Sequence, residues 1–570
     1  MIVLCALNSQ YVHTNLAIRY LAAVARNMNE DVRIVEFSIN EDVDSVVRRI
    51  YTMKPDIIGF SCYIWNIEMT CKVMQDLKKA LPELYLLAGG PEVSFDTHEF
   101  MRNNPYIDAV IRGEGEETFA ELLCRLRTSR DLSEIQGISW QREQKIIENA
   151  SRPLIEDLET LPLPYEVMDH DERIVYYEAS RGCPFNCSYC LSSAESGVRY
   201  MPMERAKQDL EKLDDMGVKQ VKLVDRSFNC HQQRALDIMR YLADLPGKTC
   251  FHFELIADLI NDEMLDFLEK VPYGRFQFEI GIQSINDDTL QAVNRKQDHE
   301  RAAQAITRLM NYGNIHIHLD LIAGLPYEDL ESFAASFNWL NGLRAHYLQL
   351  GFLKMLKGSP LRQNADKYGY IYKSHPPYEV IRNPWLSYKD ICRLKTIEDI
   401  VQRFYNSGAF KHTLEYCEQN YYSGHPFNMY NDVAIYWEEN GFTDQPLARS
   451  KLYGLWLLAM GQTLTELLDR VNDLLVFDFV INNVNLELPE SLNPLTYQEI
   501  PLKKAIHAIT TDGFDIVGSV KIKKPAKSRV IEFKTDVLEL AGVKKAEERL
   551  IYRVVFKWED NICSAKYIDL

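Results

Sequence analysis

Short apolar runs alternate with helix-like segments over the first two thirds of the chain, and this alternation restricts the fold more than any other feature. In the N-terminal part these runs are short and rich in Val, Ile, Leu and aromatic residues, which is typical of strands. They are residues 2–7, 32–39, 56–63, 84–90 and 108–115. Strands that are separated by helices are expected to run parallel, so the pattern predicts a doubly wound α/β domain over residues 1–145.

A second series of the same kind follows a proline-rich joint at residues 158–168, which lies in a predicted linker of residues 146–172. Its strand-like runs are residues 175–182, 218–228, 250–258, 276–284, 315–326 and 347–356. Six β-α units with nearly continuous apolar strands indicate a partial (β/α)6 barrel over residues 173–370, with chemistry at the carboxyl ends of its strands. Residues 371–570 mix helical and strand-like segments without a chemical motif, so we expect a mixed α+β C-terminal domain.

Length, composition and charge exclude several classes of protein. A chain of 570 residues is expected to divide into about three or four domains. No window approaches the ~18 to 20 apolar residues of a membrane span, and no basic stretch precedes the apolar N-terminus, so we expect a cytoplasmic protein without a membrane partner. A net charge of −18 argues against general affinity for nucleic acids.

Three of the twelve cysteines cluster in the segment SRGCPFNCSYC, at Cys183, Cys187 and Cys190, directly after the first strand of the second series. In a long chain without a signal peptide, such a cluster indicates metal binding rather than disulfides. Thiolates are soft ligands that suit iron–sulfur clusters and zinc. A structural zinc site would normally close with a nearby fourth Cys or His, whereas the nearest histidine downstream is His231. Three local ligands favour a [4Fe–4S] cluster with one free iron, and zinc is the alternative.

Glycines and polar residues follow the strands of the N-terminal domain, at the edge where such sheets bind ligands. Glycines there allow tight turns and close approach of the backbone to a ligand, although they could also serve only to turn the chain. The candidate ligand contacts are Asn8, Ser61, Gly89, Gly90, Pro91, Gly113, Glu114 and Gly115.

The C-x3-C-x2-C spacing, with the aromatic Tyr189 before the last cysteine, resembles the signature of the radical S-adenosylmethionine (SAM) superfamily. The resemblance covers residues 173–360. It implies a [4Fe–4S] cluster whose free iron binds SAM, and an external electron donor such as flavodoxin or ferredoxin, whose electron splits SAM into methionine and a 5′-deoxyadenosyl radical. Tyr189 of the cysteine loop, polar residues expected at strand ends and the glycine-proline turn at Gly324 match the family's SAM contacts, although the strand-end residues could instead satisfy barrel-end hydrogen bonds. These residues are Tyr189, Asp225, Glu279, Gln283, Ser284 and Gly324.

The N-terminal domain is similar to the cobalamin-binding domain that precedes the barrel in one branch of this superfamily, through GFSCY, LAGGPEVSF and IRGEGEETF. This resemblance implies a corrin that lies against the glycine-rich strand ends, with cobalamin as the cofactor. The D-x-H-x-x-G motif, which supplies a cobalt ligand in the methionine synthase type of domain, is absent. His13 follows the first strand, but a lone loop histidine is usually solvated or hydrogen-bonded. The C-terminal domain resembles a domain of uncharacterised function found in one subgroup.

The commonest chemistry in this branch is methylation of an unactivated carbon, in which methylcobalamin delivers a methyl group to a substrate radical. The cofactors perform the difficult steps, so no side-chain base or nucleophile is required. We therefore expect a cobalamin-dependent radical SAM methyltransferase whose small-molecule or peptide substrate the sequence does not identify. The alternatives are rearrangement or cyclisation without methyl transfer, a corrinoid-binding sensor, and a methylthiotransferase with a second cluster on Cys5, Cys62 and Cys71. The three-cysteine loop argues against the sensor, and the mid-helix position of Cys71 argues against a second cluster.

Overall fold

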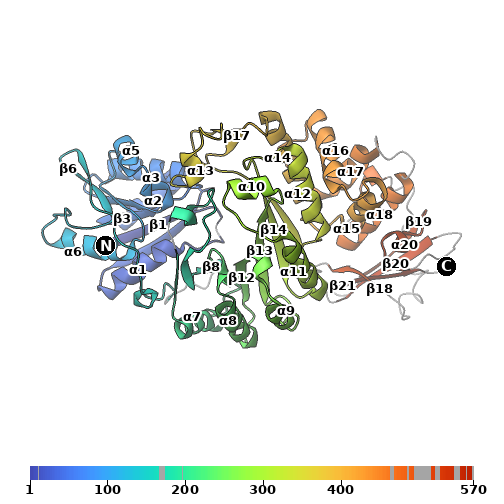
Figure 1. Cartoon of the computed structure of the whole chain (residues 1–570), viewed down its shortest axis with the longest axis horizontal. Helices are drawn as coiled ribbons and strands as arrows, with labels where there is room; N and C mark the ends of the chain where they lie inside the picture. Colours follow the sequence, from blue (N-terminus) through green and yellow to red (C-terminus); the bar gives the residue numbers. More distant parts are fainter. Residues whose placement is uncertain are drawn as a thin grey trace. The chain divides into compact units, whose positions relative to one another are not determined.

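The structure is a computed structural model, and it describes residues 1–10, 12–165, 174–194, 197–461, 468–483, 487–492, 515–519, 527–544, 552–559 and 562–567. The chain forms two compact units, and Figure 1 shows their elements. The first unit comprises Met1–Asp329 and Gly351–Ser387, and the second comprises Leu330–Leu350 and Tyr388–Leu570. The last part of the predicted linker, residues 166–172, lies outside the described residues.

The N-terminal part of the first unit is a seven-stranded sheet with the order β2-β1-β3-β4-β5-β6-β7. Strands β1 to β5 are parallel, whereas β6 and β7 add antiparallel strands at one edge. The strands are β1 (Ile2–Asn8), β2 (Val32–Ser38), β3 (Ile57–Ser61), β4 (Tyr85–Gly89), β5 (Ala109–Ile111), β6 (Ile138–Arg142) and β7 (Lys145–Glu148). Ligands bind such sheets where the strand order reverses, here between β1 and β3.

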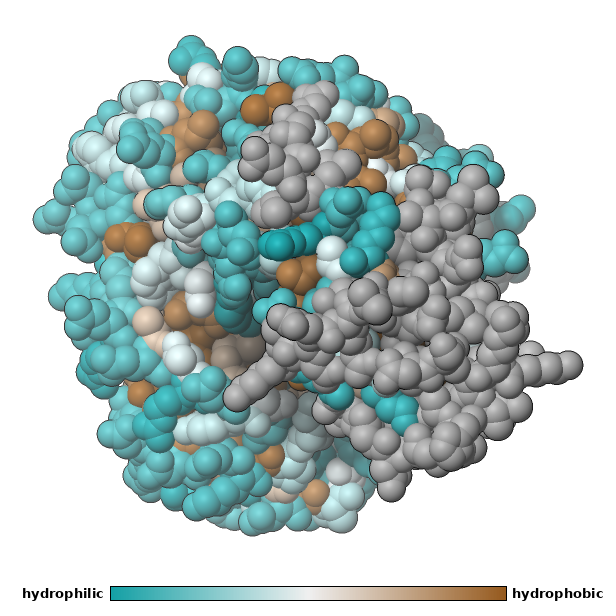
Figure 2. Space-filling view, turned by 90° about the vertical axis from the view of Figure 1, so that its right-hand side faces the viewer, coloured by the Kyte–Doolittle hydropathy of each residue, from teal (hydrophilic) through white to brown (hydrophobic). Residues whose placement is uncertain are grey.

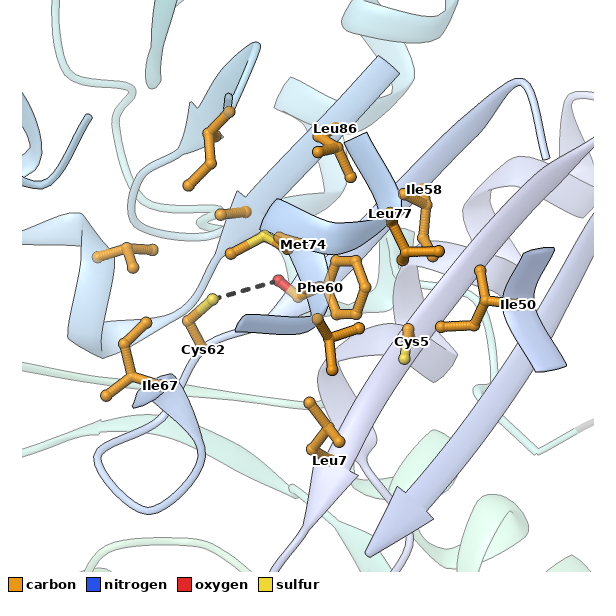
Figure 3. Packing of buried hydrophobic residues seen from close by; sticks show 14 of the residues in the cluster. Cys5, Leu7, Ile50, Ile58, Phe60, Cys62, Ile67, Met74, Leu77 and Leu86 are labelled. Atoms are coloured by element: carbon orange, nitrogen blue, oxygen red, sulfur yellow. Dashed lines mark hydrogen bonds between the residues drawn. The ribbon is translucent and has the colours of Figure 1, made fainter. Parts of the chain in front are cut away.

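Helices cover both faces of this sheet because its strand residues alternate between two apolar cores. The helices are α1 (Leu16–Asn27), α2 (Val43–Met53), α3 (Ile67–Ala80), α4 (Pro91–Ser94), α5 (Thr97–Asn103) and α6 (Glu116–Arg127). Val3 and Cys5 of β1 join the core that α2 and α3 cover, which Figure 3 shows. Ile2 and Leu4 join the opposite core, which α1 and α6 cover.

The second sheet of the first unit has the order β15-β14-β13-β12-β11-β8, and β8 and β11 to β14 pair in parallel. Its strands are β8 (Ile174–Tyr177), β11 (Gln220–Leu223), β12 (Cys250–Leu255), β13 (Phe276–Gln283), β14 (His316–Ala323) and β15 (Tyr347–Phe352). The boundary between the two units falls inside β15. The intervening helices include α7 (Met203–Asp215), α8 (Gln232–Asp244), α9 (Asp262–Leu268), α10 (Asp287–Ala292) and α11 (His299–Tyr312).

The first strand predicted for this region, residues 175–182, is two strands. Strand β8 ends at Tyr177, and a separate β9 (Ser180–Cys183) pairs antiparallel with β10 (Gly197–Tyr200). The break has a clear cause, because the backbone N–H of Ala179 donates to the carboxylate of Asp225 (2.9 Å) rather than to a neighbouring strand. The cysteine loop therefore begins on a hairpin and not on the parallel sheet.

The second unit combines helices with an antiparallel sheet. Its helices include α12 (Leu330–Gly342), α14 (Tyr388–Phe404), α15 (Lys411–Tyr421), α16 (Pro426–Glu439), α17 (Arg449–Gly461), α18 (Leu468–Asn482) and α20 (Val537–Leu540). Its sheet has the order β18-β21-β20-β19, from β18 (Asp515–Ser519), β19 (Lys527–Phe533), β20 (Tyr552–Glu559) and β21 (Ile562–Tyr567). The predicted fold class, parallel α/β regions followed by a mixed α+β region, is confirmed.

Figure 2 shows one face of the molecule, on which the coloured residues are mostly hydrophilic and the hydrophobic ones occur in small groups. Such scattered exposed apolar residues are normal for globular proteins. Among the described helices, none combines the length and the hydrophobicity that a membrane crossing requires.

Candidate functional site

The three clustered cysteines lie at the end of β9 and in the segment between the two strands of the β9–β10 hairpin. Cys183 is the last residue of β9, and Cys187 and Cys190 follow in the loop before a short 3₁₀ helix, η2 (Leu191–Ala194). The hairpin needs glycine at residue 182, because a Cβ there would lie 2.2 Å from the carbonyl oxygen of Gly197. The backbone N–H of Ser188 donates to the carbonyl of Val293 (2.9 Å), which fixes the loop to the end of α10.

A guanidinium group that the sequence did not single out lies beside this loop. Arg295 donates to the hydroxyl of Tyr189 (3.3 Å) and to the carbonyl of Gly281. Burial raises the pKa of the Cys187 thiol, and the positive charge of Arg295 counteracts that rise. A cation here favours the thiolate, which is the form that binds iron. Arg295 lies in the connection between α10 and α11, where no strand end drew attention to it.

The cysteine loop fits an iron–sulfur cluster through its donors. In the part of the chain that the structure describes, no three or more His, Cys, Asp or Glu side chains converge as a ready-made metal site. Cys183 and Cys187 are each only 8% exposed, and their thiols are soft ligands of the kind that such clusters use. The assignment of the three cysteines to a cluster therefore rests on their chemistry and spacing and remains a prediction.

Asp225 is buried against the start of β9, the strand that ends at Cys183. Its buried carboxylate accepts hydrogen bonds from the backbone N–H of Ala179 and the hydroxyl of Ser180, at the start of β9. Burial raises the pKa of Asp225 to about 6, although these two hydrogen bonds oppose the rise. The contacts support a role in holding the hairpin that ends at Cys183, and direct contact with SAM remains a prediction.

The polar residues predicted at the end of the fourth barrel strand are spread over two places. Gln283 ends β13 with a positive φ of 72°, and Ser284 follows and donates to the carboxylate of Glu328 (2.5 Å). Glu279 instead lies in the middle of β13, since the buried apolar alternation continues to Ile282. Its carboxylate contacts Nε2 of His252 (3.1 Å), and this bond is the main cause of its lowered pKa.

Gly324 forms the turn that follows β14. Its φ of 100° lies in the region that favours glycine. Its carbonyl accepts hydrogen bonds from the hydroxyl of Tyr370 (2.9 Å) and the side-chain amide of Asn383 (3.0 Å). Hydrogen bonds from Tyr370 and Asn383 therefore hold the turn in place, and its contact with SAM remains a prediction.

Two further carboxylates face the interior of the barrel, and sequence reasoning missed both. Along β13 and β14, buried residues alternate with partly exposed ones. Asp320 is one of the partly exposed residues of β14, and Glu254 is partly exposed on β12. Burial raises the pKa of Glu254 to about 7 and that of Asp320 well above its usual range. One oxygen of Asp320, Oδ1, has no hydrogen-bond partner among the residues that the structure describes. Because both lie inside apparently apolar strands, only the alternation of their neighbours could have indicated them.

A cavity of about 110 Å³ lies at the strand ends of the N-terminal domain, between β1, β3, β4 and β5 and helices α1 and α6. Five of the predicted contacts line it, namely Ser61, Gly89, Gly90, Gly113 and Gly115. Most of the remaining lining is apolar and includes Leu4, Leu21 and Phe119. The structure thus brings these five residues together around a mostly apolar, partly open space.

Gly90 has the strictest conformational requirement of these glycines. Its φ is 112°, and a Cβ there would lie 2.6 Å from the carbonyl oxygen of Cys62. Gly115 differs, because its φ of −92° is open to any residue and a Cβ would make ordinary contacts with Ile111 and Leu21. The absence of a side chain at Gly115 therefore serves the cavity rather than the backbone.

The other predicted contacts at this edge do not line the cavity. Asn8 donates to the carbonyl of His13 (2.8 Å), and Pro91 begins helix α4. The carboxylate of Glu114 accepts hydrogen bonds from Arg199 of β10 (2.8 Å) and from the backbone N–H of Ile155 (2.6 Å). Contact of these residues with a corrin remains a prediction.

Three aromatic or imidazole side chains, those of His13, Tyr63 and Trp65, also lie in the loops that follow the strands of this sheet. His13 contacts the hydroxyl of Tyr176 on β8 through Nδ1 (2.7 Å), so one ring nitrogen is engaged inside the unit. Tyr63 and Trp65, in the loop after β3, stack with their centroids 4.4 Å apart, and Trp65 is 47% exposed. Sequence reasoning did not single out Trp65, for which an aromatic residue in a strand-end loop was the available signal.

Three other cysteines of the N-terminal domain, Cys5, Cys62 and Cys71, belong to its core or pack against it. Figure 3 places Cys5 and Cys62 among aliphatic side chains, and neither is measurably exposed. The thiol of Cys62 donates to the carbonyl of Phe60 (3.8 Å), and burial raises its pKa. Burial also raises the pKa of Cys71 to about 11. Thiols packed among apolar core side chains are typical of structural cysteines.

Models of three families match the chain in succession. A B12-binding domain matches residues 2–123, the radical SAM superfamily matches residues 177–340, and a protein of unknown function, DUF4080, matches residues 366–551. The chain therefore belongs to the cobalamin-binding radical SAM proteins and is a radical SAM enzyme. The cofactors of this class are a [4Fe–4S] cluster, SAM and cobalamin.

The chain is similar to an uncharacterized methyltransferase of Pyrococcus horikoshii, with 28% identity over 61% of this chain and 78% of that protein. It is also 28% identical to the cobalamin-dependent radical SAM methyltransferase TokK of Streptomyces tokunonensis, over 61% of this chain and 53% of TokK. The match thus spans about half the length of TokK. Among solved structures, the cobalamin-dependent SAM radical enzyme OxsB has a TM-score of 0.57 at 15% identity, over 90% of this chain and 82% of OxsB. That likeness supports the fold.

Proposed function

We propose that the chain is a cobalamin-dependent methyltransferase that methylates an unactivated carbon of a small-molecule or peptide substrate. The observation that carries the proposal is a direct link between the two predicted cofactor regions. Arg181, two residues before Cys183, forms an ion pair with Glu116 (2.6 Å), and Glu116 lines the glycine-rich cavity. A radical centre and a methyl carrier must act on one substrate carbon, so a rigid link between their sites suits this reaction.

When bound, the cofactors supply the chemistry, since SAM is cleaved reductively at the cluster and cobalamin carries the methyl group. The protein binds and orients them. Cys183, Cys187 and Cys190 hold the cluster, and Arg295 provides a cation for the carboxylate of SAM. Glu254 provides a carboxylate for a positively charged part of SAM. Asp320, whose raised pKa favours the protonated form, can donate to and accept from a ribose hydroxyl.

In the N-terminal domain, the cavity supports a cobalamin whose dimethylbenzimidazole tail is displaced from cobalt. A partly open apolar space between a sheet and two helices suits a flat aromatic base, because the base leaves water on binding. The glycines at the strand ends leave the edge of the sheet open to the corrin. An external electron donor such as flavodoxin or ferredoxin would reduce the cluster.

The test measures the two products of SAM. A methyltransferase of this kind uses SAM once for reductive cleavage and once as methyl donor, so 5′-deoxyadenosine and S-adenosylhomocysteine should form in roughly equal amounts with the substrate. Replacing the three loop cysteines should stop formation of deoxyadenosine. Loss of corrin binding should stop formation of S-adenosylhomocysteine. Deoxyadenosine without S-adenosylhomocysteine would overturn methyl transfer and favour rearrangement or cyclisation.

A further inference from the structure

Residues 353–383, which we call the strap, belong to the first unit although the DUF4080 match begins inside them at residue 366. The strap contains a short helix α13 (Pro360–Gln363) and two short strands, β16 (Ile371–Tyr372) and β17 (Val380–Arg382). Its beginning is fixed to the end of β14, because the backbone N–H of Leu353 donates to the carbonyl of Ala323 (2.9 Å). Part of the segment of unknown function is therefore built into the unit that carries the cofactor regions.

The strap contacts the N-terminal domain directly behind the glycine-rich turn at Gly90. Glu92 is only 4% exposed. Its carboxylate oxygen Oε1 forms an ion pair with Lys357 (2.9 Å) and accepts a hydrogen bond from the hydroxyl of Tyr378 (2.5 Å). Burial and the bond to Glu92 raise the pKa of Tyr378, so its hydroxyl keeps the proton that it donates. Gly358 fits against the ring of Phe95, where a Cβ would lie only 2.4 Å from the ring.

The same strap contacts the other two predicted cofactor segments. The backbone N–H of Leu361 donates to the carbonyl of Ser188 (2.8 Å), between the second and third cysteines of the cluster loop. Tyr370 and Asn383 both donate to the carbonyl of Gly324 (2.9 and 3.0 Å), in the turn assigned to SAM. One continuous segment thus contacts the cobalamin turn, the cluster loop and the SAM turn.

We propose that the strap is a clamp that holds these three segments in register, with Lys357 and Tyr378 as positioning residues for the cobalamin-binding turn. The inference rests on the proposed function, which assigns the three segments to their cofactors. A buried carboxylate that loses its partners destabilises the conformation that buries it, so Glu92 holds its turn in place only while the strap is docked. Segments held by one rigid element are energetically coupled, so a ligand that orders one segment should favour binding at another.

The test measures coupling between two cofactors in the full chain with its cluster reconstituted. Hydroxocobalamin binding is followed by its absorbance, and SAM binding by the change in the electron paramagnetic resonance spectrum of the reduced cluster. In the unmodified chain, saturating hydroxocobalamin should tighten SAM binding by about fivefold or more. In the double variant Lys357→Met/Tyr378→Phe that factor should fall below about twofold, while each cofactor still binds alone.

The control is Tyr372→Phe, the same change on the same strap. No hydrogen bond involves its hydroxyl among the described residues, so this variant should couple the cofactors as the unmodified chain does. Amide hydrogen exchange at residues 89–95 gives a readout that needs no cofactor, and the double variant should exchange faster there. If the double variant does not fold, Tyr378→Phe alone replaces it, because it removes one hydroxyl and no charge.

The outcomes separate this inference from the proposed function. If the unmodified chain binds neither hydroxocobalamin nor SAM, the proposed function fails. If it binds both and they bind independently, the clamp is wrong and the proposed function stands. Coupling that survives in the Lys357→Met/Tyr378→Phe variant, or that is equally lost in Tyr372→Phe, also overturns the clamp.

Discussion

The two parallel sheets of the first unit prepare their strand ends in opposite ways. In the N-terminal domain the proposed site is made by missing side chains, because Gly89, Gly90 and Gly115 line a mostly apolar cavity of about 110 Å³. In the barrel the proposed site is made by carboxyl side chains on the partly exposed face of the strands, among them Glu254 and Asp320. The first arrangement selects a ligand by shape and the second by charge and hydrogen bonding.

The two arrangements also destabilise the protein without ligand in different ways. An apolar cavity costs only the packing contacts that would fill it, whereas carboxylates gathered in a partly buried interior repel one another. Glu254 shows this, because burial and the neighbouring Glu279 raise its pKa while Arg226 opposes the rise. We therefore expect SAM binding in the barrel to depend on pH and charge, and cobalamin binding in the N-terminal domain to depend on the volume of the side chains at the strand ends.

The largest effect should come from the cysteine loop. Changing Cys183, Cys187 and Cys190 together to alanine should remove iron and the brown absorbance of the cluster, because no thiolate ligand remains. Iron and sulfide analysis of anaerobically prepared protein, about four of each per chain, measures this. Corrinoid binding should survive, and Cys230→Ala, a cysteine outside the loop, should keep its iron. Iron retained in the triple variant would contradict the cluster assignment.

The next effect should come from filling the cavity. Gly115→Leu adds a side chain without backbone strain, so it should weaken hydroxocobalamin binding about a hundredfold and leave the iron content unchanged. Gly90→Trp should abolish binding, since even a Cβ clashes there. Equilibrium dialysis measures the affinity, and Gly342→Leu, where a Cβ meets open space, is the control. Unchanged affinity in Gly115→Leu would place the corrinoid elsewhere.

A smaller effect should appear in the pH dependence of SAM binding. Because the pKa of Glu254 is about 7, raising the pH from 6 to 7.5 ionises it and should tighten binding of the positively charged SAM up to about tenfold. The folding stability of the protein without SAM should change in the opposite direction. The raised pKa of Glu254 stabilises the fold at low pH, and that contribution is lost as the pH rises through about 7. Calorimetric titration measures the affinity.

Two variants decide whether Glu254 causes this pH dependence. Glu254→Gln should flatten the profile, because no carboxylate remains to ionise. Glu204→Gln, whose side chain is 80% exposed on α7 of the same barrel, should keep the rise. The same rise in Glu254→Gln as in the unmodified chain would assign it to another group.

The smallest effect should come from the core cysteines of the N-terminal domain. Cys62→Ala should lower the free energy of unfolding by about 1–2 kcal/mol, because it leaves a small void in a packed core. The iron content should stay at about four, measured with chemical denaturation on the same preparation. Cys124→Ala, at an exposed cysteine, should change stability by less than about 0.5 kcal/mol. Loss of iron in Cys62→Ala would favour the second cluster of a methylthiotransferase.

Local patterns predicted much of the fold. The strand-like runs of both series correspond to β1 to β5 and to β8 and β11 to β15, because apolar alternation is a property of neighbouring residues. The three-cysteine loop and the glycine-rich strand ends could also be singled out as candidate sites, since each pattern lies within one segment, and their cofactor assignments stay predictions. The break between β8 and β9 could not be predicted in this way, because it depends on Asp225, which lies more than forty residues further along the chain.

The sequence by itself determined the order of the domains and the class of cofactors, and it predicted the segments that bind them. Only the tertiary structure brought Arg295 beside Cys187, turned Glu254 and Asp320 into the barrel, and joined Lys357 and Tyr378 to Glu92. Each of these contacts joins residues far apart in the chain, and no local pattern encodes which partner a lone charged residue will meet. Folding decides it, because a partly buried charge is stable only where the packing of distant segments supplies a partner.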